Sequence, residues 1–249
     1  MKYKLTFKLP HTIVLPQQYN HLLQAALMNW LNDENYQKFI HEVGFQLDKR
    51  SYKLYTFSKI FGRFELDKLH HKILFQDEIH IYIASYDSQY IEFLLNNIIS
   101  GNPIRLGNQW LYLERAEAIQ EAYTSPCVVK TLSPIIIYST LMKLDGTHKQ
   151  YYYSPMECEY SQMLGDNLVR KFAAYHGRKP EDTAFSIRLL EQGRESFIFY
   201  KKASMKGWNG IFRIEGSEEM MRMALDGGMG SRNSAGFGCV MRIQQAEKR

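Results

Sequence analysis

GGMGSRNSAGFGCV, residues 227–240, is the stretch on which the interpretation of the whole chain depends. A small polar segment with one arginine, Arg232, is surrounded by five glycines, Gly227, Gly228, Gly230, Gly236 and Gly238. Because glycine has no Cβ, backbone N–H groups in such a loop can approach a phosphate chain closely. A structural alternative is a glycine pair that ends a helix, followed by a turn and a strand with a bulge.

The context of this loop excludes two common phosphate-binding motifs. A P-loop requires GxxxxGK[ST] between a strand and a helix, and a dinucleotide-binding loop requires GxGxxG in the same position. Neither spacing is present here. The order of elements is also reversed, because the pattern predicts a helix over 217–225 before the loop and a strand over 237–243 after it.

The composition is that of a globular protein with a small excess of positive charge. The chain has 249 residues, 45% of them hydrophobic, and a formal net charge of +5 from 31 basic and 26 acidic side chains. This charge permits a polyanionic partner. The 17 Tyr, 14 Phe and 3 Trp side chains can stack on unpaired bases wherever they are exposed.

Cysteine spacing and apolar runs bear on the cellular compartment. Cys127, Cys158 and Cys239 lie far apart among apolar or aromatic neighbours and form no CxxC motif, which predicts buried free thiols in a reducing compartment. There is no run of about 18 apolar residues, and the first ten residues alternate instead of forming a signal-peptide core. We therefore expect a cytoplasmic protein that does not enter a membrane.

Hydrophobic periodicity predicts the same order of elements twice, β-α-β-β-α-β. In the first half we expect a strand over 2–9, helices over 18–31 and 34–43 with Asp33 as the cap of the second, strands over 53–58 and 72–85 joined by a long turn around Gly62, a helix over 87–99 and a strand over 110–121. In the second half we expect a strand over 127–139 interrupted at Ser133-Pro134, a turn over 145–150, a helix over 156–175, strands over 184–190 and 197–215 with an irregularity at Lys206-Gly207, and the helix and strand that flank the glycine loop. This order is the ferredoxin-like pattern, so the fold class is α+β with two tandem ferredoxin-like domains, residues 1–123 and 127–249.

The segment GMGSRNSAGFG, residues 228–238, resembles the C-terminal glycine-rich signature of the repeat-associated mysterious proteins. The likeness is to the CRISPR-associated endoribonucleases that cut precursor CRISPR RNA. Other segments are also similar to that family: YNHLLQAALMNWL (19–31), FIHEVGF (39–45), KLYTFS (53–58), TLSPIIIY (131–138) and YSPMECEY (153–160). The resemblance covers nearly the whole chain. It implies two ferredoxin-like domains and CRISPR repeat RNA as the partner.

His41 is the residue on which the predicted chemistry depends. At helical spacing, Tyr36, Phe39, Ile40 and Val43 share one side, so His41 falls on the opposite side and faces solvent. An exposed imidazole can take and give protons near neutral pH. The alternative is a surface histidine with no function.

The resemblance places His41 at the catalytic histidine of the family and Lys53 at a lysine that some members have. Met28 falls where some members have a catalytic tyrosine, and methionine can donate neither a hydrogen bond nor a proton. Tyr19 and Tyr36 are the candidates to replace that tyrosine. In the implied reaction, the ribose 2′-hydroxyl attacks the phosphate, His41 transfers a proton and Lys53 stabilises the phosphorane. No metal or cofactor is required.

Two regions are candidates to bind RNA. Between residues 196 and 214 there are basic side chains and Trp208 but no acidic residue, which suits a phosphate track with a stacking platform. The alternative is a solvated hairpin edge whose lysines prevent aggregation. The candidates are Lys201, Lys202, Lys206 and Arg213 in this region, and Gly228, Gly230, Ser231, Arg232, Asn233, Ser234, Gly236 and Gly238 in the glycine loop.

These observations predict a metal-independent endoribonuclease that cleaves CRISPR repeat RNA. Its products are a 2′,3′-cyclic phosphate or 3′-phosphate and a 5′-hydroxyl. The alternative is a member of the same superfamily that holds CRISPR RNA without cutting it. The spacing of the glycine loop disfavours a nucleotide-dependent enzyme. Subunits of a CRISPR interference complex and a second copy of the chain are further candidate partners.

Overall fold

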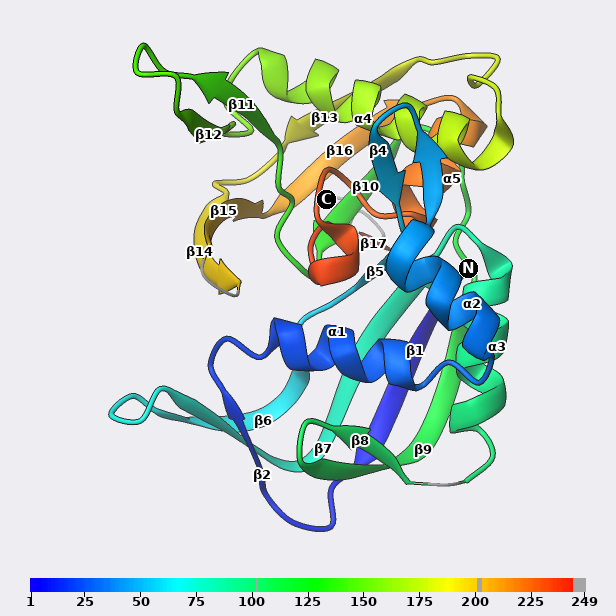
Figure 1. The fold of residues 1–249 in the computed structure, drawn as a ribbon, viewed down its shortest axis with the longest axis vertical. Helices are drawn as coiled ribbons and strands as arrows, with labels where there is room; N and C mark the ends of the chain where they lie inside the picture. Colours follow the sequence, from blue (N-terminus) through cyan, green and yellow to red (C-terminus); the bar gives the residue numbers. More distant parts are fainter. Residues whose placement is uncertain (102, 201–202, 244–249) are drawn as a thin grey trace, which may run out of the picture.

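The computed structural model describes residues 1–101, 103–200 and 203–243, and two antiparallel sheets organise the chain. Each sheet has the β-α-β-β-α-β order of a ferredoxin-like unit, so this is an α+β protein with two such units in tandem (Figure 1). We call them the N-terminal unit and the C-terminal unit. Within the described ranges, no helix has the length and apolar character needed to cross a membrane.

The N-terminal unit is organised around β7 (Lys72–Ser85), which pairs with β1 (Lys2–Lys8) along one edge and with β5 and β6 along the other. β9 (Gln109–Ile119) continues the sheet beyond β1. The other elements are β2 (Ile13–Pro16), α1 (Asn20–Asn29), α2 (Glu34–Lys38), a π-helical turn (Phe39–Val43), β3 (Phe45–Leu47), β4 (Arg50–Tyr52), β5 (Tyr55–Phe57), β6 (Phe61–Asp67), α3 (Ser88–Ile98) and β8 (Ile104–Leu106).

The C-terminal unit repeats this plan with the strand order β13-β16-β10-β17. Two additional hairpins, β11–β12 and β14–β15, project from it on the side away from α5 (Figure 1). The elements are β10 (Cys127–Thr131), β11 (Tyr138–Met142), β12 (His148–Tyr152), α4 (Glu159–His176), β13 (Phe185–Leu189), β14 (Arg194–Tyr200), β15 (Ala203–Asn209), β16 (Ile211–Gly216), α5 (Glu218–Asp226), a 3₁₀ turn (Asn233–Ala235) and β17 (Val240–Ile243).

Three helices begin at the polar residues that precede their apolar pattern. The Asp33 carboxylate accepts a hydrogen bond from the Tyr36 N–H at 2.7 Å, which caps α2. Asp87 caps α3 in the same way, and the Ser217 hydroxyl caps α5. Each cap satisfies a backbone donor that has no partner inside the helix.

One expected strand and one expected turn are wrong in detail. The single strand expected over 197–215 is a hairpin of β14 and β15 followed by β16, and Gly210 separates β15 from β16. The long turn expected around Gly62 is strand β6, with a bulge between Gly62 and Arg63. A Cβ on Gly62 would lie 2.5 Å from the Glu78 carbonyl oxygen, so glycine is needed for this bulge. Alternating apolar residues do not reveal where a chain reverses.

The glycine loop lies between the two units and bonds to both of them. On the N-terminal side, the Asn20 amide donates to the Ala235 carbonyl at 3.1 Å and the Thr56 hydroxyl donates to the Phe237 carbonyl at 2.8 Å. On the C-terminal side, the Gly238 N–H donates to the Pro134 carbonyl at 2.8 Å. The loop therefore connects the two units.

The glycines of this loop serve close packing. Gly228, Gly230, Gly236 and Gly238 are buried and have positive φ. A Cβ on Gly238 would lie 1.9 Å from the Met229 carbonyl oxygen, and one on Gly230 would lie 2.3 Å from the Ile136 carbonyl oxygen. The packing of the loop therefore requires these glycines, and what the loop offers to a ligand comes from the residues between them.

Candidate functional site

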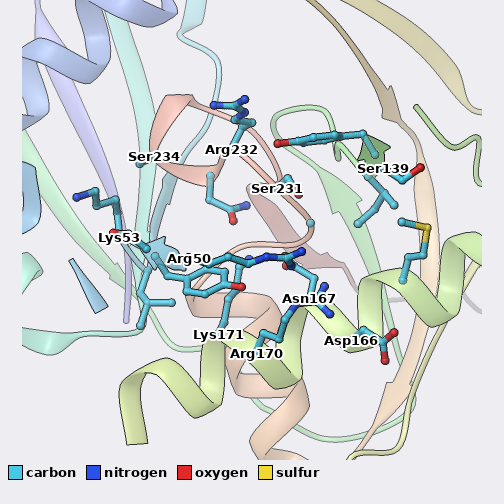
Figure 2. A pocket seen from close by; sticks show the side chains of 18 of the residues that line it. Arg50, Lys53, Ser139, Asp166, Asn167, Arg170, Lys171, Ser231, Arg232 and Ser234 are labelled. Carbon is cyan, nitrogen blue, oxygen red and sulfur yellow. The ribbon is translucent and has the colours of Figure 1, made fainter. Parts of the chain in front are cut away.

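A basic pocket of about 780 Å³ opens where the two units and the glycine loop meet (Figure 2). Its walls come from residues 50–54 at β4 and β5, residues 137–140 at β11, one face of α4, and residues 230–234 of the loop. Of the described residues that line it, Asp166 is acidic and five are basic: Arg50, Lys53, Arg170, Lys171 and Arg232. This excess of positive charge suits a polyanionic ligand.

Lys53 lines this pocket and contacts the backbone of His41, which is not itself among the described residues that line it. His41 lies in the π-helical turn with its side chain exposed, as the helical spacing predicted. The Lys53 ammonium donates a hydrogen bond to the His41 carbonyl oxygen at 3.0 Å, and Lys53 lines the pocket. Burial lowers the pKa of Lys53, because desolvation disfavours its charged form.

Loop residues 230–234 form another wall of the pocket, and Arg232 is the most exposed of them. The Arg232 guanidinium lies 5.8 Å from the centre of the Tyr138 ring. Within the described ranges, no acceptor bonds the backbone N–H groups of Arg232, Asn233 or Ser234. The middle of the loop therefore offers backbone donors and one cation, whereas Gly228, Gly236 and Gly238 are occupied in packing.

The two tyrosines suggested as replacements for a third catalytic group are both buried. The Tyr19 hydroxyl accepts a hydrogen bond from the Ile60 N–H at 2.9 Å, and burial raises the pKa of Tyr19 to about 12. Burial, and then hydrogen bonding to Asp87, also raises the pKa of Tyr36, whose hydroxyl donates to Asp87 at 2.6 Å. Met28 is half-buried against the core of the N-terminal unit. Neither hydroxyl is presented to the pocket.

The two described basic residues proposed on the 196–214 segment, Lys206 and Arg213, do not line the pocket. Lys206 forms an ion pair with Glu195 of the same hairpin, and its ammonium also lies over the Phe197 and Trp208 rings. Arg213 belongs to β16, and its guanidinium lies 3.9 Å from the Glu215 carboxylate. Lys201 and Lys202 lie outside the described residues. Neither Lys206 nor Arg213 is therefore brought to the pocket that Lys53 and Arg232 line.

Sequence reasoning missed the contributions of β4 and α4. Arg50, Tyr52, Asn167, Arg170 and Lys171 all line the pocket. Lys171 is 2% exposed, and its ammonium donates to the Gly228 carbonyl at 2.6 Å. Burial lowers the pKa of Lys171 to about 7. The spacing of Asn167, Arg170 and Lys171, which places them on one side of a helix, was the available signal.

Comparisons with known proteins agree with the fold. The family model "CRISPR associated protein Cas6, C-terminal" matches residues 117–241. The CRISPR-associated endoribonuclease Cas6 1 of Methanocaldococcus jannaschii is 22% identical over 253 residues, covering 100% of this chain and 95% of that protein. The CRISPR-associated endoribonuclease Cas6 of Pyrococcus furiosus is 25% identical over 234 residues, covering 91% of this chain and 83% of that protein.

Solved structures with the same fold cover almost all of the chain. A Cas6-related protein from Pyrococcus furiosus superposes with a TM-score of 0.84 at 21% identity, over 98% of this chain and 99% of that one. A structure described as a RAMP protein binding different RNA substrates superposes with a TM-score of 0.81 at 21% identity, over 98% of this chain and 100% of that one. With the family model spanning half of its length, this chain belongs to the Cas6 family of CRISPR-associated proteins.

Proposed function

We propose that this protein is an endoribonuclease that cleaves CRISPR repeat RNA without a metal ion and so generates guide RNAs. The observation that carries the proposal is the hydrogen bond from Lys53 to the His41 carbonyl, made by a lysine that also lines a basic pocket. This bond links the backbone of His41, whose side chain is exposed, to a cation on a surface suited to phosphates. The names of the relatives from M. jannaschii and P. furiosus support the same reaction class.

The proposed reaction is a transesterification within the RNA. The 2′-oxygen bonds to phosphorus and loses its proton, while the bond from phosphorus to the leaving 5′-oxygen breaks and that oxygen gains a proton. His41 carries one of these two proton transfers. The products are a 2′,3′-cyclic phosphate, or a 3′-phosphate after hydrolysis, and a 5′-hydroxyl.

Lys53 stabilises the negative charge that develops on the phosphorane oxygens. Its ammonium donates a hydrogen bond to the His41 carbonyl, which keeps it close to the backbone of the residue that carries the imidazole. Partial burial strengthens its interaction with an anion, because water screens it less than it would screen an exposed lysine. Arg232 and the N–H groups of residues 232–234 hold the RNA backbone at the wall that the loop forms.

The proposal is tested with repeat RNA in EDTA. The parent protein should produce two fragments, and RNA that lacks the 2′-hydroxyl next to the cleaved bond should bind and stay intact. His41→Ala should slow cleavage about 100- to 10,000-fold, the usual contribution of one acid–base group, while RNA affinity changes little. Cleavage of the 2′-deoxy RNA would contradict the mechanism, and full activity of His41→Ala would contradict the choice of residue.

A second candidate function is RNA binding without cleavage. Met28 favours it, because the side chain at this position cannot donate a proton and neither Tyr19 nor Tyr36 reaches the pocket. A protein of this kind would give a shifted band and no fragments in the same EDTA experiment.

The domain boundary and the further partners also remain proposals. We propose that residues 1–123 and 127–249 are separate domains that hold RNA between them. Subunits of an interference complex and a second copy of the chain are candidate partners. Size measurement of the purified protein with and without RNA tests the pairing of two copies.

A further inference from the structure

The basic pocket contains buried polar atoms that have no partner. Among the described residues, nothing hydrogen-bonds to the Tyr52 hydroxyl, the Asn167 Oδ1 atom or the Arg170 Nε atom. All three residues line the pocket, and Asn167 is 8% exposed. Buried polar groups in folded proteins are nearly always paired, so a concentration of unpaired ones in a single cavity indicates that a ligand supplies the partners.

These three residues come from both units and line one cavity. Tyr52 belongs to β4, and the hairpin of β3 and β4 packs against α4. Asn167 and Arg170 are three residues apart on α4, so they lie on one side of that helix. Figure 2 shows Arg50 extending toward Asn167 and Arg170. In the part of the chain that the structure describes, no carboxylate forms an ion pair with Arg50 or Arg170.

The chemistry of the unpaired atoms restricts the ligand. Arg170 Nε is a donor and needs an anionic or neutral acceptor, which a phosphate provides. Asn167 Oδ1 is an acceptor and needs a donor, which a phosphate diester lacks. The Tyr52 hydroxyl can serve either purpose. One nucleotide satisfies all of them, because it combines a phosphate with a ribose hydroxyl or base N–H.

We propose that Tyr52, Asn167 and Arg170 form a subsite that binds one ribonucleotide next to the cleaved bond. Arg170 bonds its phosphate, and Asn167 accepts a hydrogen bond from its ribose hydroxyl or from a base N–H. This subsite rests on the proposed RNA substrate. Its nearness to the cleaved bond follows from Tyr52, which precedes Lys53 in the chain and lines the same pocket.

The experiment measures affinity for an uncleavable repeat RNA, 2′-deoxy at the cut, by fluorescence anisotropy. Tyr52→Phe and Arg170→Gln should each weaken binding roughly five- to tenfold, the usual effect of losing one hydrogen bond to a ligand. The matched control is Tyr160→Phe, which removes another buried hydroxyl without a partner, in the core of the C-terminal unit and outside the pocket. Its affinity should equal that of the parent.

A stability measurement separates a ligand-binding role from a structural one. Tyr52→Phe removes a hydroxyl that bonds nothing in the free protein, so its melting temperature should equal or exceed that of the parent. A lower melting temperature combined with unchanged RNA affinity would show a structural role and overturn the proposal.

The donor on the RNA is identified with Asn167→Leu and two series of modified RNAs. In one series single riboses lack the 2′-hydroxyl, and in the other single bases are removed. One modified RNA in these series lacks the donor that Asn167 binds. This RNA should bind the parent more weakly than unmodified RNA does, but it should bind Asn167→Leu as well as unmodified RNA does, because the two changes delete the same hydrogen bond. Independent losses at every position would overturn the assignment of Asn167.

Failure of this subsite is distinguishable from failure of the proposed reaction. If the parent cleaves repeat RNA and both Tyr52→Phe and Arg170→Gln bind like the parent, the subsite is wrong and the reaction stands. If the parent does not cleave but the two variants lose affinity and Tyr160→Phe does not, the subsite stands and the reaction is wrong.

Discussion

Arg232 is the residue at which the glycine loop presents its charge. Its guanidinium is exposed beside the Tyr138 ring, and its backbone has a φ of 62°. Arg232→Gln should lower affinity for repeat RNA about tenfold and reduce the salt dependence of binding by about one phosphate contact. Titrations at several salt concentrations measure both quantities. Gln adopts this backbone as readily as Arg, so stability should not change.

The control for Arg232 is Arg105, another exposed arginine stacked on an aromatic ring, Trp110, at 5.3 Å. Arg105 belongs to β8, the last strand of the N-terminal sheet beyond β9 (Figure 1), and does not line the pocket. Arg105→Gln should leave RNA affinity unchanged. Equal losses in the two variants would mean that general positive charge, not the position of Arg232, determines binding.

Gly238 shows the structural requirement of the loop at the scale of one residue. Its φ is 71°, and a Cβ would lie 1.9 Å from the Met229 carbonyl oxygen. Gly146 has a φ of 77° but no atom within 4 Å of a Cβ. Gly238→Ala should therefore lower the free energy of unfolding by about 3 kcal/mol or more, and Gly146→Ala by about 1–2 kcal/mol. Urea denaturation measures both, and equal losses would show that backbone strain alone matters.

At the scale of one element, the short helix α2 directly precedes the turn that carries His41. The Asp33 cap bonds the Tyr36 N–H, and a helix of five residues has little other internal stabilisation. Asp33→Ala should cost about 1 kcal/mol of stability, and Asp33→Asn much less, because Asn also caps helices. Thermal unfolding measures the difference. Asp33→Ala should also cleave RNA more slowly, because the turn at Phe39–Val43 follows directly on the helix that loses its cap. Equal stability and equal cleavage rates of Asp33→Ala and Asp33→Asn would contradict this.

The same scale shows how far sequence patterns reach. Periodicity and caps located the main helices, because one apolar face and one polar cap are enough to specify a helix. The hairpin of β3 and β4 was not predicted, since its strands have three residues each and no alternation that a window can detect. It nevertheless brings Arg50 and Tyr52 to the pocket.

At the scale of the whole molecule, Lys171 joins α4 to the loop between the two units through the Gly228 carbonyl. Burial lowers its pKa to about 7, against about 10.5 in the unfolded chain. Between these values the unfolded chain binds more protons, so the parent gains stability as pH rises, by at most about 1.4 kcal/mol per pH unit. Below pH 7 both states are protonated and this gain is absent.

Lys171→Met removes the titrating group and isolates this effect. The free energy of unfolding of the parent, relative to that of Lys171→Met, should rise steadily from pH 7 to pH 10. Below pH 7 the difference between the two free energies should be constant. Urea denaturation at several pH values measures the two free energies of unfolding. Lys149→Met, at an exposed lysine of β12, should show no such trend. A difference between the parent and Lys171→Met that stays constant up to pH 10 would contradict the buried position of the charge.

The amino-acid sequence by itself determined the two ferredoxin-like units, the glycine loop and the exposure of His41, because these depend on local periodicity and on residue types that tolerate unusual backbone. Only the tertiary structure decided which side chains share the pocket. Tyr52 and Asn167 are more than 100 positions apart, and they meet because β4 of one unit packs on α4 of the other. For the same reason, the sequence did not reveal that Tyr19 and Tyr36 are buried away from the pocket. Burial depends on how the units pack, and a local sequence pattern carries no information about that packing.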